Sequence, residues 1–249
     1  MTFLEGVGTR IIAHRGLALD APENTLLAFL RALSAGATHL ETDIHASADG
    51  VAVIAHDPDL ARVAGREVQV GQLTMLELRR IDLGHGQGFC SLAEALDAFP
   101  EARFNIDVKD ARAASPAVDA ILAARAVDRV LVTSFAPDRR RAVADRLPGV
   151  ASSPSVREFV PALVGAKLGM GSSTRRALRG FVAVQVLERR GPVRIVTRRT
   201  VDRIHAAGAE VHVWTVNDPG DMARLLELGV DGIVTDRCDL LKELVDTRR

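Results

Sequence analysis

The sequence predicts a closed barrel of parallel strands with a helix after each strand, and three observations support this α/β fold class. Apolar runs that suit strands alternate with amphipathic runs that suit helices about eight times. The length of 249 residues is typical of such a barrel, and 47% hydrophobic residues can supply one large core. The composition shows no break that would divide the chain. A doubly wound open sheet is the alternative, but HRGLALD after the first strand lacks the Gly-rich dinucleotide-binding fingerprint.

The N-terminal part of the chain predicts three strands and one helix. The strands lie at residues 10–14, 37–45 and 51–57. Between the first two, Pro22 opens a helix with acidic Glu23 in its first turn and Gly36 as its stop. Asp49-Gly50 predicts a tight turn that leads into the third strand. The chain therefore returns toward its first section at the end of the third strand.

Residues 58–88 interrupt the alternation and predict a small insertion. Glycine-rich turns surround one short helix at 74–81. After the insertion, residues 91–100 predict a helix with Ser91 as N-cap. Glu94 lies three residues later, which is the spacing of a capping box.

The rest of the chain alternates regularly between strands and helices. The predicted strands lie at 103–109, 129–135, 150–155, 181–188, 210–216 and 230–236. The predicted helices lie at 115–126, 137–147, 156–169, 197–208, 218–229 and 238–248. This number of units in this length favours closure into a barrel over an open sheet.

Composition limits the classes of partner and compartment. The chain has 32 basic and 32 acidic residues, and this balance argues against a nucleic-acid or anionic-membrane surface. The two cysteines, Cys90 and Cys238, form neither a disulfide framework nor a metal-ligand spacing. The N-terminus MTFLEGVGTR lacks the features of a signal peptide, and no run is apolar enough to span a membrane. We therefore expect a cytoplasmic protein with a small-molecule substrate and no stable membrane association; its oligomeric state stays open.

Four ionisable residues lie at or near the ends of the first three predicted strands: His14, Glu41, Asp43 and His56. In a strand, side chains two residues apart share a face, so Glu41 and Asp43 point the same way. Two acids side by side repel each other unless a cation or protons lie between them. The pattern therefore predicts a metal ion.

Further polar residues fall at the same end of the predicted barrel, where the active sites of such barrels lie. They are Asp107, Lys109 and Trp214, with Gln185 as a lone polar residue in an apolar strand. The other five histidines are expected to be structural or exposed, although His45 shares the face of Glu41 and Asp43. Residues from distant parts of the sequence would thus meet at one mouth.

Several motifs together resemble those of the glycerophosphodiester phosphodiesterase family. They are HRG, PENT, ETDIHASADGVAVIAHD, LTMLELRRIDLG, NIDVK, VHVWTVND and GVDGIVTD. Their order and spacing match over nearly the whole chain. The resemblance implies a TIM (β/α)8 barrel formed by residues 1–249 as a single domain, with the small insertion at 58–88 after the second barrel strand region. It also implies metal-dependent hydrolysis of glycerophosphodiesters to sn-glycerol 3-phosphate and an alcohol.

The resemblance also implies a role for each site residue. His14 and His56 are similar to the catalytic acid/base pair, and Glu41, Asp43 and Asp107 to the metal ligands. The substrate-binding positions would be Arg15, Lys109, Gln185 and Trp214, the first two at the phosphate and Trp214 beside the glycerol. Three carboxylates without a cysteine or histidine ligand favour a hard cation, Ca²⁺ or Mg²⁺. The nucleophile, either water or a glycerol hydroxyl, stays open.

Two departures from the family pattern stand out. Asp107 replaces the usual glutamate, so the third ligand is one methylene shorter. Cys238 replaces the proline of the closing motif, which should affect only the start of the last helix.

Two other functions remain as alternatives. A phospholipase D or sphingomyelinase D type enzyme would use the same barrel with paired histidines and three carboxylates, but the chain shows neither a secretion signal nor a disulfide framework. A non-catalytic phosphodiester-binding barrel would not need both histidines. The insertion has no tyrosine or tryptophan to enclose a quaternary ammonium, so we expect broad tolerance for the leaving alcohol and a strict requirement for glycerol 3-phosphate.

Overall fold

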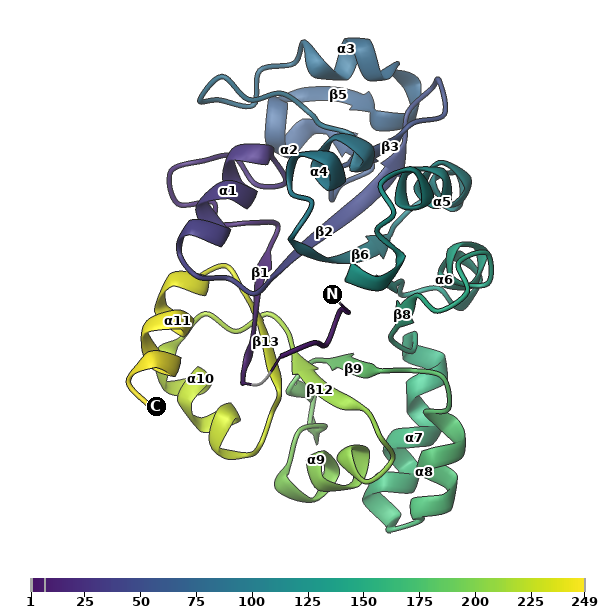
Figure 1. Cartoon of the computed structure of the whole chain (residues 1–249), viewed down its shortest axis with the longest axis vertical. Coiled ribbons are helices and arrows are strands. Elements are labelled where there is room, and N and C mark those ends of the chain that lie inside the picture. Colours follow the sequence, from purple (N-terminus) through teal and green to yellow (C-terminus); the bar gives the residue numbers. More distant parts are fainter. Residues whose placement is uncertain (1, 7, 249) are drawn as a thin grey trace.

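The computed structural model describes residues 2–6 and 8–248, and within them eight parallel strands form a nearly closed barrel. The strand order around the ring is β8-β7-β6-β2-β1-β13-β12-β9, with helices around the outside (Figure 1). The barrel strands are β1 (Arg10–His14), β2 (His39–Ala46), β6 (Arg103–Val108), β7 (Val130–Thr133), β8 (Ala151–Ser152), β9 (Ala183–Val186), β12 (Glu210–Val213) and β13 (Gly232–Thr235). The predicted TIM-barrel fold is confirmed.

The helices around the barrel follow the predicted pattern, with α8 as an addition. They are α1 (Leu26–Ser34), α4 (Leu92–Ala98), α5 (Ala114–Ala123), α6 (Pro137–Ala144), α7 (Val156–Leu168), α8 (Gly171–Ala177), α9 (Arg198–His205), α10 (Pro219–Glu227) and α11 (Cys238–Asp246). The predicted capping box of Ser91 and Glu94 is present at the start of α4. The last helix begins at Cys238, the position of the family's proline.

The last gap of the ring, between β8 and β9, is bridged by a backbone hydrogen bond rather than by a strand ladder. Val182 N, just before β9, donates to Ser152 O in β8 at 3.1 Å. At the opposite side the first and last strands pair in parallel, with Ile11 beside Ile233. The chain therefore closes on itself, and its strand ends gather at one mouth.

Alternation along β2 decides which side chains enter the barrel. Leu40 and Ile44 are buried among the helices, in the same core cluster as Phe29 of α1 and Phe104 of β6. The rings of Phe29 and Phe104 meet edge to face at 5.8 Å. Because successive strand residues face opposite sides, this packing turns Glu41 into the barrel.

The N-terminal segment covers the other end of the barrel. Phe3 is buried against Leu131 and Ala183, and its carbonyl oxygen lies 2.8 Å from Nε2 of His39 at the start of β2. Figure 1 shows this segment across the middle of the ring. One end of the barrel is thus filled by the chain itself, which leaves the carboxyl-terminal mouth for a substrate.

The predicted insertion is a small antiparallel unit beyond the mouth (Figure 1). It follows the predicted third strand, which is β3 (Ala52–Ile54). Its own elements are β4 (Asp59–Leu60), α2 (Ala61–Ala64), β5 (Arg66–Gln69), η1 (Val70–Gln72) and α3 (Met75–Arg79). As predicted, β3 returns antiparallel to β2, with Ile54 beside Ile44. A separate cluster of apolar side chains, including Leu60 and Leu78, holds the insertion together.

Four short elements elsewhere have no counterpart in the predicted pattern. They are η2 (Ala111–Ala113), η3 (Val127–Arg129), β10 (Arg189–Arg190) and β11 (Val193–Arg194). The first two are single turns of 3-10 helix, and β10 pairs with β11 in a short hairpin. All four are too short to leave a periodic pattern in the sequence.

The start of α1 differs from the prediction. The helix begins at Leu26 with Thr25 as its N-cap, so Pro22 and Glu23 precede it. The Thr25 side chain accepts a hydrogen bond from Ala28 N, and this cap starts the helix three residues after Pro22. Glu23 instead forms ion pairs with Arg15 and Arg62, and this tertiary contact overrides the local preference for a first-turn acid.

Gly16, in the turn that follows His14, offers a test of how tightly the mouth is built. Its φ is +83°, and a Cβ there would lie 2.6 Å from the backbone carbon of Ala28. Gly16→Ala should lower the free energy of unfolding by about 3 kcal/mol, since backbone strain and a backbone clash add. The matched control is Gly50→Ala, where φ is +78° but no atom lies within 4 Å. Gly50→Ala should lower the free energy of unfolding, measured with denaturant, by only ~1 kcal/mol. An equal loss in the two variants would contradict the clash at Gly16.

Candidate active site

The predicted acidic pair and the third acid lie on adjacent strands inside the mouth of the barrel. Asp43 of β2 is paired in register with Asp107 of β6, and Glu41 with Asn105. All three carboxylates are buried, with relative exposures of 6% for Glu41, 2% for Asp43 and 6% for Asp107. Burying several acids together costs free energy unless positive charge accompanies them. The structure brings these three residues together as predicted.

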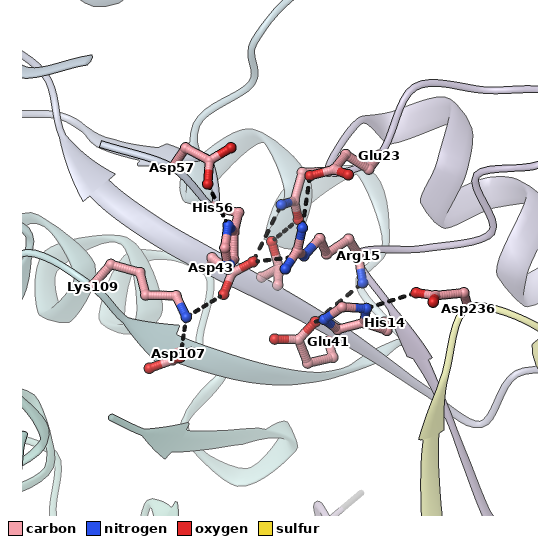
Figure 2. Close-up of polar contacts among 12 residues, drawn as sticks. His14, Arg15, Glu23, Glu41, Asp43, His56, Asp57, Asp107, Lys109 and Asp236 are labelled. Atoms are coloured by element: carbon pink, nitrogen blue, oxygen red, sulfur yellow. Dashed lines mark hydrogen bonds and ion pairs between the residues drawn. The ribbon is translucent and has the colours of Figure 1, made fainter. Parts of the chain in front are cut away.

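Two cations of the chain lie among these carboxylates (Figure 2). Lys109 Nζ is 2.6 Å from Asp107 Oδ2 and 3.1 Å from Asp43 Oδ1. Arg15 Nε lies 3.4 Å from the other oxygen of Asp43. The positive charges expected at the phosphate are therefore already within reach of the acids, and Lys109 lies between two of them.

Negative charge at the site is not fully balanced. Burial, together with the charge of Asp43, raises the pKa of Glu41 well above its ordinary value. Burial also raises the pKa of Asp107, although Lys109 opposes the shift. In addition, Asp107 Oδ1 is buried without a hydrogen-bond partner. These acids would gain from a further cation.

The donor chemistry of the site suits a hard divalent ion. Glu41, Asp43 and Asp107 offer only carboxylate oxygens, and the free oxygen of Asp107 is available as a ligand. Within the described ranges, however, no three acidic, histidine or cysteine side chains are arranged to hold a metal. The Lys109 ammonium occupies the position between Asp43 and Asp107, so an ion shared by both acids would replace it there.

His14 lies at the end of β1 beside this cluster. Its Nδ1–H donates to Asp236 Oδ1 at 2.7 Å, while Nε2 lies 4.0 Å from Glu41 Oε2. Asp236, just after β13, also accepts from Asn217 at 2.6 Å. Burial lowers the pKa of His14, but the bond to Asp236 and the charge of Glu41 outweigh it, so the pKa lies above its ordinary value. The ring is thereby oriented with Nε2 toward the acids.

His56 follows β3 and is oriented in the same way. Its Nδ1–H donates to Asp57 Oδ1 at 2.7 Å. Arg62 of the insertion donates to the other oxygen of Asp57 at 2.6 Å and also bridges to Glu23. In both histidines Nδ1–H thus donates to a carboxylate, as Figure 2 shows, and this hydrogen bond leaves Nε2 available for proton exchange.

The PENT motif at 22–25 supports the acids from the β1–α1 connection. Glu23 accepts from Arg15 at 3.0 Å, and Asn24 donates to Asp43 Oδ2 at 3.4 Å. Thr42 donates to Asn24 Oδ1 at 2.8 Å, which fixes the amide orientation. Both Arg15 and Asn24 have positive φ, a conformation that non-glycine residues adopt at a cost. Such strain is common where side chains are held for function.

Trp214 and Gln185 lie further around the mouth. Trp214, which follows β12, meets the ring of Phe135 edge to face at 5.8 Å. Lys109 Nζ lies 5.3 Å from the centre of the same Phe135 ring, so the aromatic pair adjoins the cations among the acids. In β9, Gln185 Oε1 accepts from Ser153 at 3.5 Å, and its amide nitrogen is buried without a partner.

Sequence reasoning missed several residues that orient the site: Glu23, Asn24, Asp57, Asp236, Asn217 and Phe135. All but Phe135 lie inside the motifs PENT, ETDIHASADGVAVIAHD, VHVWTVND and GVDGIVTD, which match the family pattern but were not assigned roles residue by residue. A usable signal was available, because Asp57 and Asp236 also lie just beyond strand ends. Phe135 also ends the predicted strand at 129–135, but only folding places it against Trp214.

A barrel whose mouth holds buried acids, two oriented imidazoles and fixed cations is equipped as a hydrolase for an anionic substrate. A family model described as the glycerophosphoryl diester phosphodiesterase family matches residues 14–240. The chain therefore belongs to this family and is a phosphoric diester hydrolase of the glycerophosphodiester phosphodiesterase class. The family inferred from the motifs is thereby confirmed.

Relatives and solved structures agree with this assignment. The chain is 40% identical to the probable glycerophosphodiester phosphodiesterase 2 of Mycobacterium tuberculosis, over 99% of this chain and 94% of that protein. It is 28% identical to a glycerophosphodiester phosphodiesterase of Caldanaerobacter subterraneus, covering 95% of this chain and 98% of the relative.

Two solved structures show the same fold. One from Silicibacter pomeroyi has a TM-score of 0.81 at 25% identity, covering 97% of this chain and 94% of its own. An Oleispira antarctica phosphodiesterase in complex with its product sn-glycerol-3-phosphate has a TM-score of 0.79 at 22% identity, covering 94% and 96%. Residues 2–6 and 8–248 contain no helix long and apolar enough to cross a membrane.

Proposed function

We propose that this phosphodiesterase hydrolyses glycerophosphodiesters to sn-glycerol 3-phosphate and an alcohol, with residues 1–249 as one catalytic unit. The observation that carries the proposal is the pair of histidines, each with Nδ1 bound to a carboxylate, beside a buried cluster of acids and cations. The product complex of the Oleispira antarctica phosphodiesterase supports glycerol 3-phosphate as the retained half.

Glu41, Asp43 and Asp107 are the proposed ligands of a Ca²⁺ or Mg²⁺ ion. Their oxygen-only chemistry and the uncompensated charge at Glu41 support this choice. When bound, such an ion neutralises negative charge that develops on the phosphoryl oxygens. Asp107 is one methylene shorter than the family's glutamate, yet its free Oδ1 lies in the cluster.

Arg15 and Lys109 position the phosphate. Arg15 is anchored by Asp43 and Glu23, so its charge is fixed before substrate enters and needs little reorganisation. Lys109, which an ion shared by Asp43 and Asp107 would displace, is then free to contact the phosphate. A phosphodiester is an anion that gains further charge as the attacking oxygen approaches, and preorganised cations favour that change.

His14 and His56 carry the two proton transfers. One imidazole takes a proton from the attacking oxygen, and the other gives a proton to the departing alkoxide, which otherwise leaves poorly. Asp236 and Asp57 hold the two rings through Nδ1, so that Nε2 exchanges the proton in each case. This division of labour accounts for two histidines at one site.

The glycerol half is proposed to lie beside Trp214, with the free amide nitrogen of Gln185 as a hydrogen-bond donor to a hydroxyl. The Phe135–Trp214 pair adjoins Lys109, so glycerol and phosphate can be contacted at once. A buried donor without a partner favours a ligand that supplies an acceptor. The site should therefore require the glycerol moiety.

Product analysis tests the reaction. With glycerophosphocholine, the enzyme should release choline and glycerol 3-phosphate, whereas bis(p-nitrophenyl) phosphate, which lacks glycerol hydroxyls, should have a much lower kcat/KM. Phosphorus NMR of the products is the measurement. Phosphocholine and glycerol as products would contradict the proposed bond cleavage.

The same assay addresses the two alternatives. A phospholipase D or sphingomyelinase D type enzyme should cleave lysophosphatidylcholine or sphingomyelin with a higher kcat/KM than glycerophosphocholine. A binding barrel should retain glycerophosphocholine in equilibrium dialysis without releasing choline.

A further inference from the structure

A cavity of about 260 Å³ lies between the insertion and the barrel, and the proposed chemistry does not yet use it. Its walls are His45, Pro58, Gln69, Gly71, Lys109, Asp110, Ala111, Arg112 and Arg139. The volume is below that of typical drug-sized ligand sites, which suits a fragment such as one head group. Neither Trp214 nor Gln185 is part of its walls, so it is separate from the proposed glycerol position.

The cavity adjoins the catalytic residues on two sides. Lys109 lines it, and the Lys109 ammonium contacts Asp43 and Asp107. His45 lines it as well, and its Nε2–H donates to the carbonyl oxygen of His56 at 3.1 Å. A diester with its phosphate at Lys109 can therefore extend its second alcohol into this cavity.

The charge of the walls is positive. Three cations and one acid line the cavity, and Arg112 and Asp110 bind each other at 2.9 Å. Lys109, which contacts Asp43 and Asp107, is assigned to the phosphate that is cleaved. Among the described residues, no carboxylate lies within 4.0 Å of the Arg139 guanidinium, which donates to the carbonyl oxygen of Lys109. The charge of Arg139 is thus left for a ligand.

The insertion supplies only uncharged residues to the cavity walls, namely Pro58, Gln69 and Gly71. A Cβ at Gly71 would lie 2.2 Å from Nη2 of Arg112, so the insertion backbone rests directly on that guanidinium. Within residues 2–6 and 8–248, no phenylalanine, tyrosine or tryptophan lines the cavity, so nothing there favours a quaternary ammonium over the repulsion of the cations.

From these observations we infer that the cavity binds the leaving alcohol and selects one that carries an anionic group, such as a second phosphodiester. The inference rests on the proposed function and narrows the broad head-group tolerance expected from the sequence. Arg139 is the specificity-determining residue, because its charge is the one not already neutralised by a carboxylate within contact distance.

Three diesters of sn-glycerol 3-phosphate test the inference by kcat/KM. In 1,3-bis(glycerophospho)glycerol the leaving alcohol carries a second, anionic phosphodiester. In glycerophosphoglycerol the leaving alcohol is neutral glycerol, and in glycerophosphocholine it is the cation choline. The expected order is anionic, then neutral, then cationic. The preference for the anionic diester should weaken as salt rises, since screening reduces charge attraction.

Variants assign the preference to Arg139. Arg139→Gln should lower the ratio of kcat/KM for the anionic to the neutral diester about tenfold, the scale of one hydrogen bond to a charged group. Arg139→Lys should retain part of the ratio. The control is Arg141→Gln on the same helix, whose guanidinium faces Glu158 at 2.8 Å and does not line the cavity; it should change neither rate.

Equal kcat/KM for the three diesters in wild type would overturn the inference alone. The inference would also be overturned if Arg139→Gln lowered kcat/KM for all three diesters by the same factor. That result would mean that Arg139 only positions Lys109. Cleavage of none of the diesters would overturn the proposed function itself. If Arg139→Gln fails to fold, the salt dependence of the wild-type ratio still decides the question.

Discussion

His14→Ala and His56→Ala are each expected to lower kcat by about 10²–10⁴-fold while KM changes far less, because each removes one proton transfer. The rings are held by Asp236 and Asp57 at 2.7 Å and lie beside buried acids rather than in the apolar core. Steady-state kinetics on glycerophosphocholine is the measurement. A variant that kept near-native kcat would show its histidine to be structural.

The control for the loss of an imidazole is His85→Asn. His85 is exposed in the insertion and has φ +55°, a conformation that asparagine tolerates better than alanine. Its kcat should match that of wild type. A loss similar to that of the two catalytic variants would show that the effects come from general damage to the fold.

The histidine prediction extends to pH. The bond to Asp236 is one of the causes that raise the pKa of His14, so Asp236→Asn should lower that pKa. The limb of the pH–rate profile that belongs to His14 should therefore move to lower pH. The other limb should stay in place, because Asp236 holds His14 alone of the two catalytic histidines. Movement of both limbs would argue against separate roles.

Removal of divalent cations by a chelator is expected to abolish turnover, and added Ca²⁺ or Mg²⁺ should restore it. The reason is electrostatic: the raised pKa of Glu41 reflects burial and the charge of Asp43, and the chain supplies too little positive charge to offset both. Activity after exhaustive chelation, with metal content measured by mass spectrometry, is the test. Full activity in the stripped enzyme would contradict metal dependence.

Calorimetric titration with Ca²⁺ separates binding from turnover. Asp43→Asn should weaken binding strongly, since Asp43 lies between the other two acids and is 2% exposed. Glu77→Gln is the control, because Glu77 caps the short helix α3 in the insertion and glutamine can serve in a capping box. Equal affinity in both variants would remove Asp43 from the metal site.

Much of this molecule could be predicted from the sequence because its signals are local or periodic. Alternation of apolar runs led to the barrel, and period two along β2 put Glu41 and Asp43 on one face. The rule that barrel sites lie at carboxyl ends of strands then brought Asp107 and Lys109 to the same mouth. The capping box at Ser91 needed only four residues. Each inference rests on backbone geometry, which depends little on distant contacts.

Only the tertiary structure decided which partners these residues have. Long-range packing places Lys109 between Asp43 and Asp107. It also brings Asp236 to His14 across 222 positions in the sequence. Glu23 lies outside its expected helix, where it pairs with Arg15 and Arg62. The basic cavity has the same origin, since Gly71, Arg112 and Arg139 come from three separate elements, η1, η2 and α6. Charge interactions act through space rather than along the chain, so no periodicity records them.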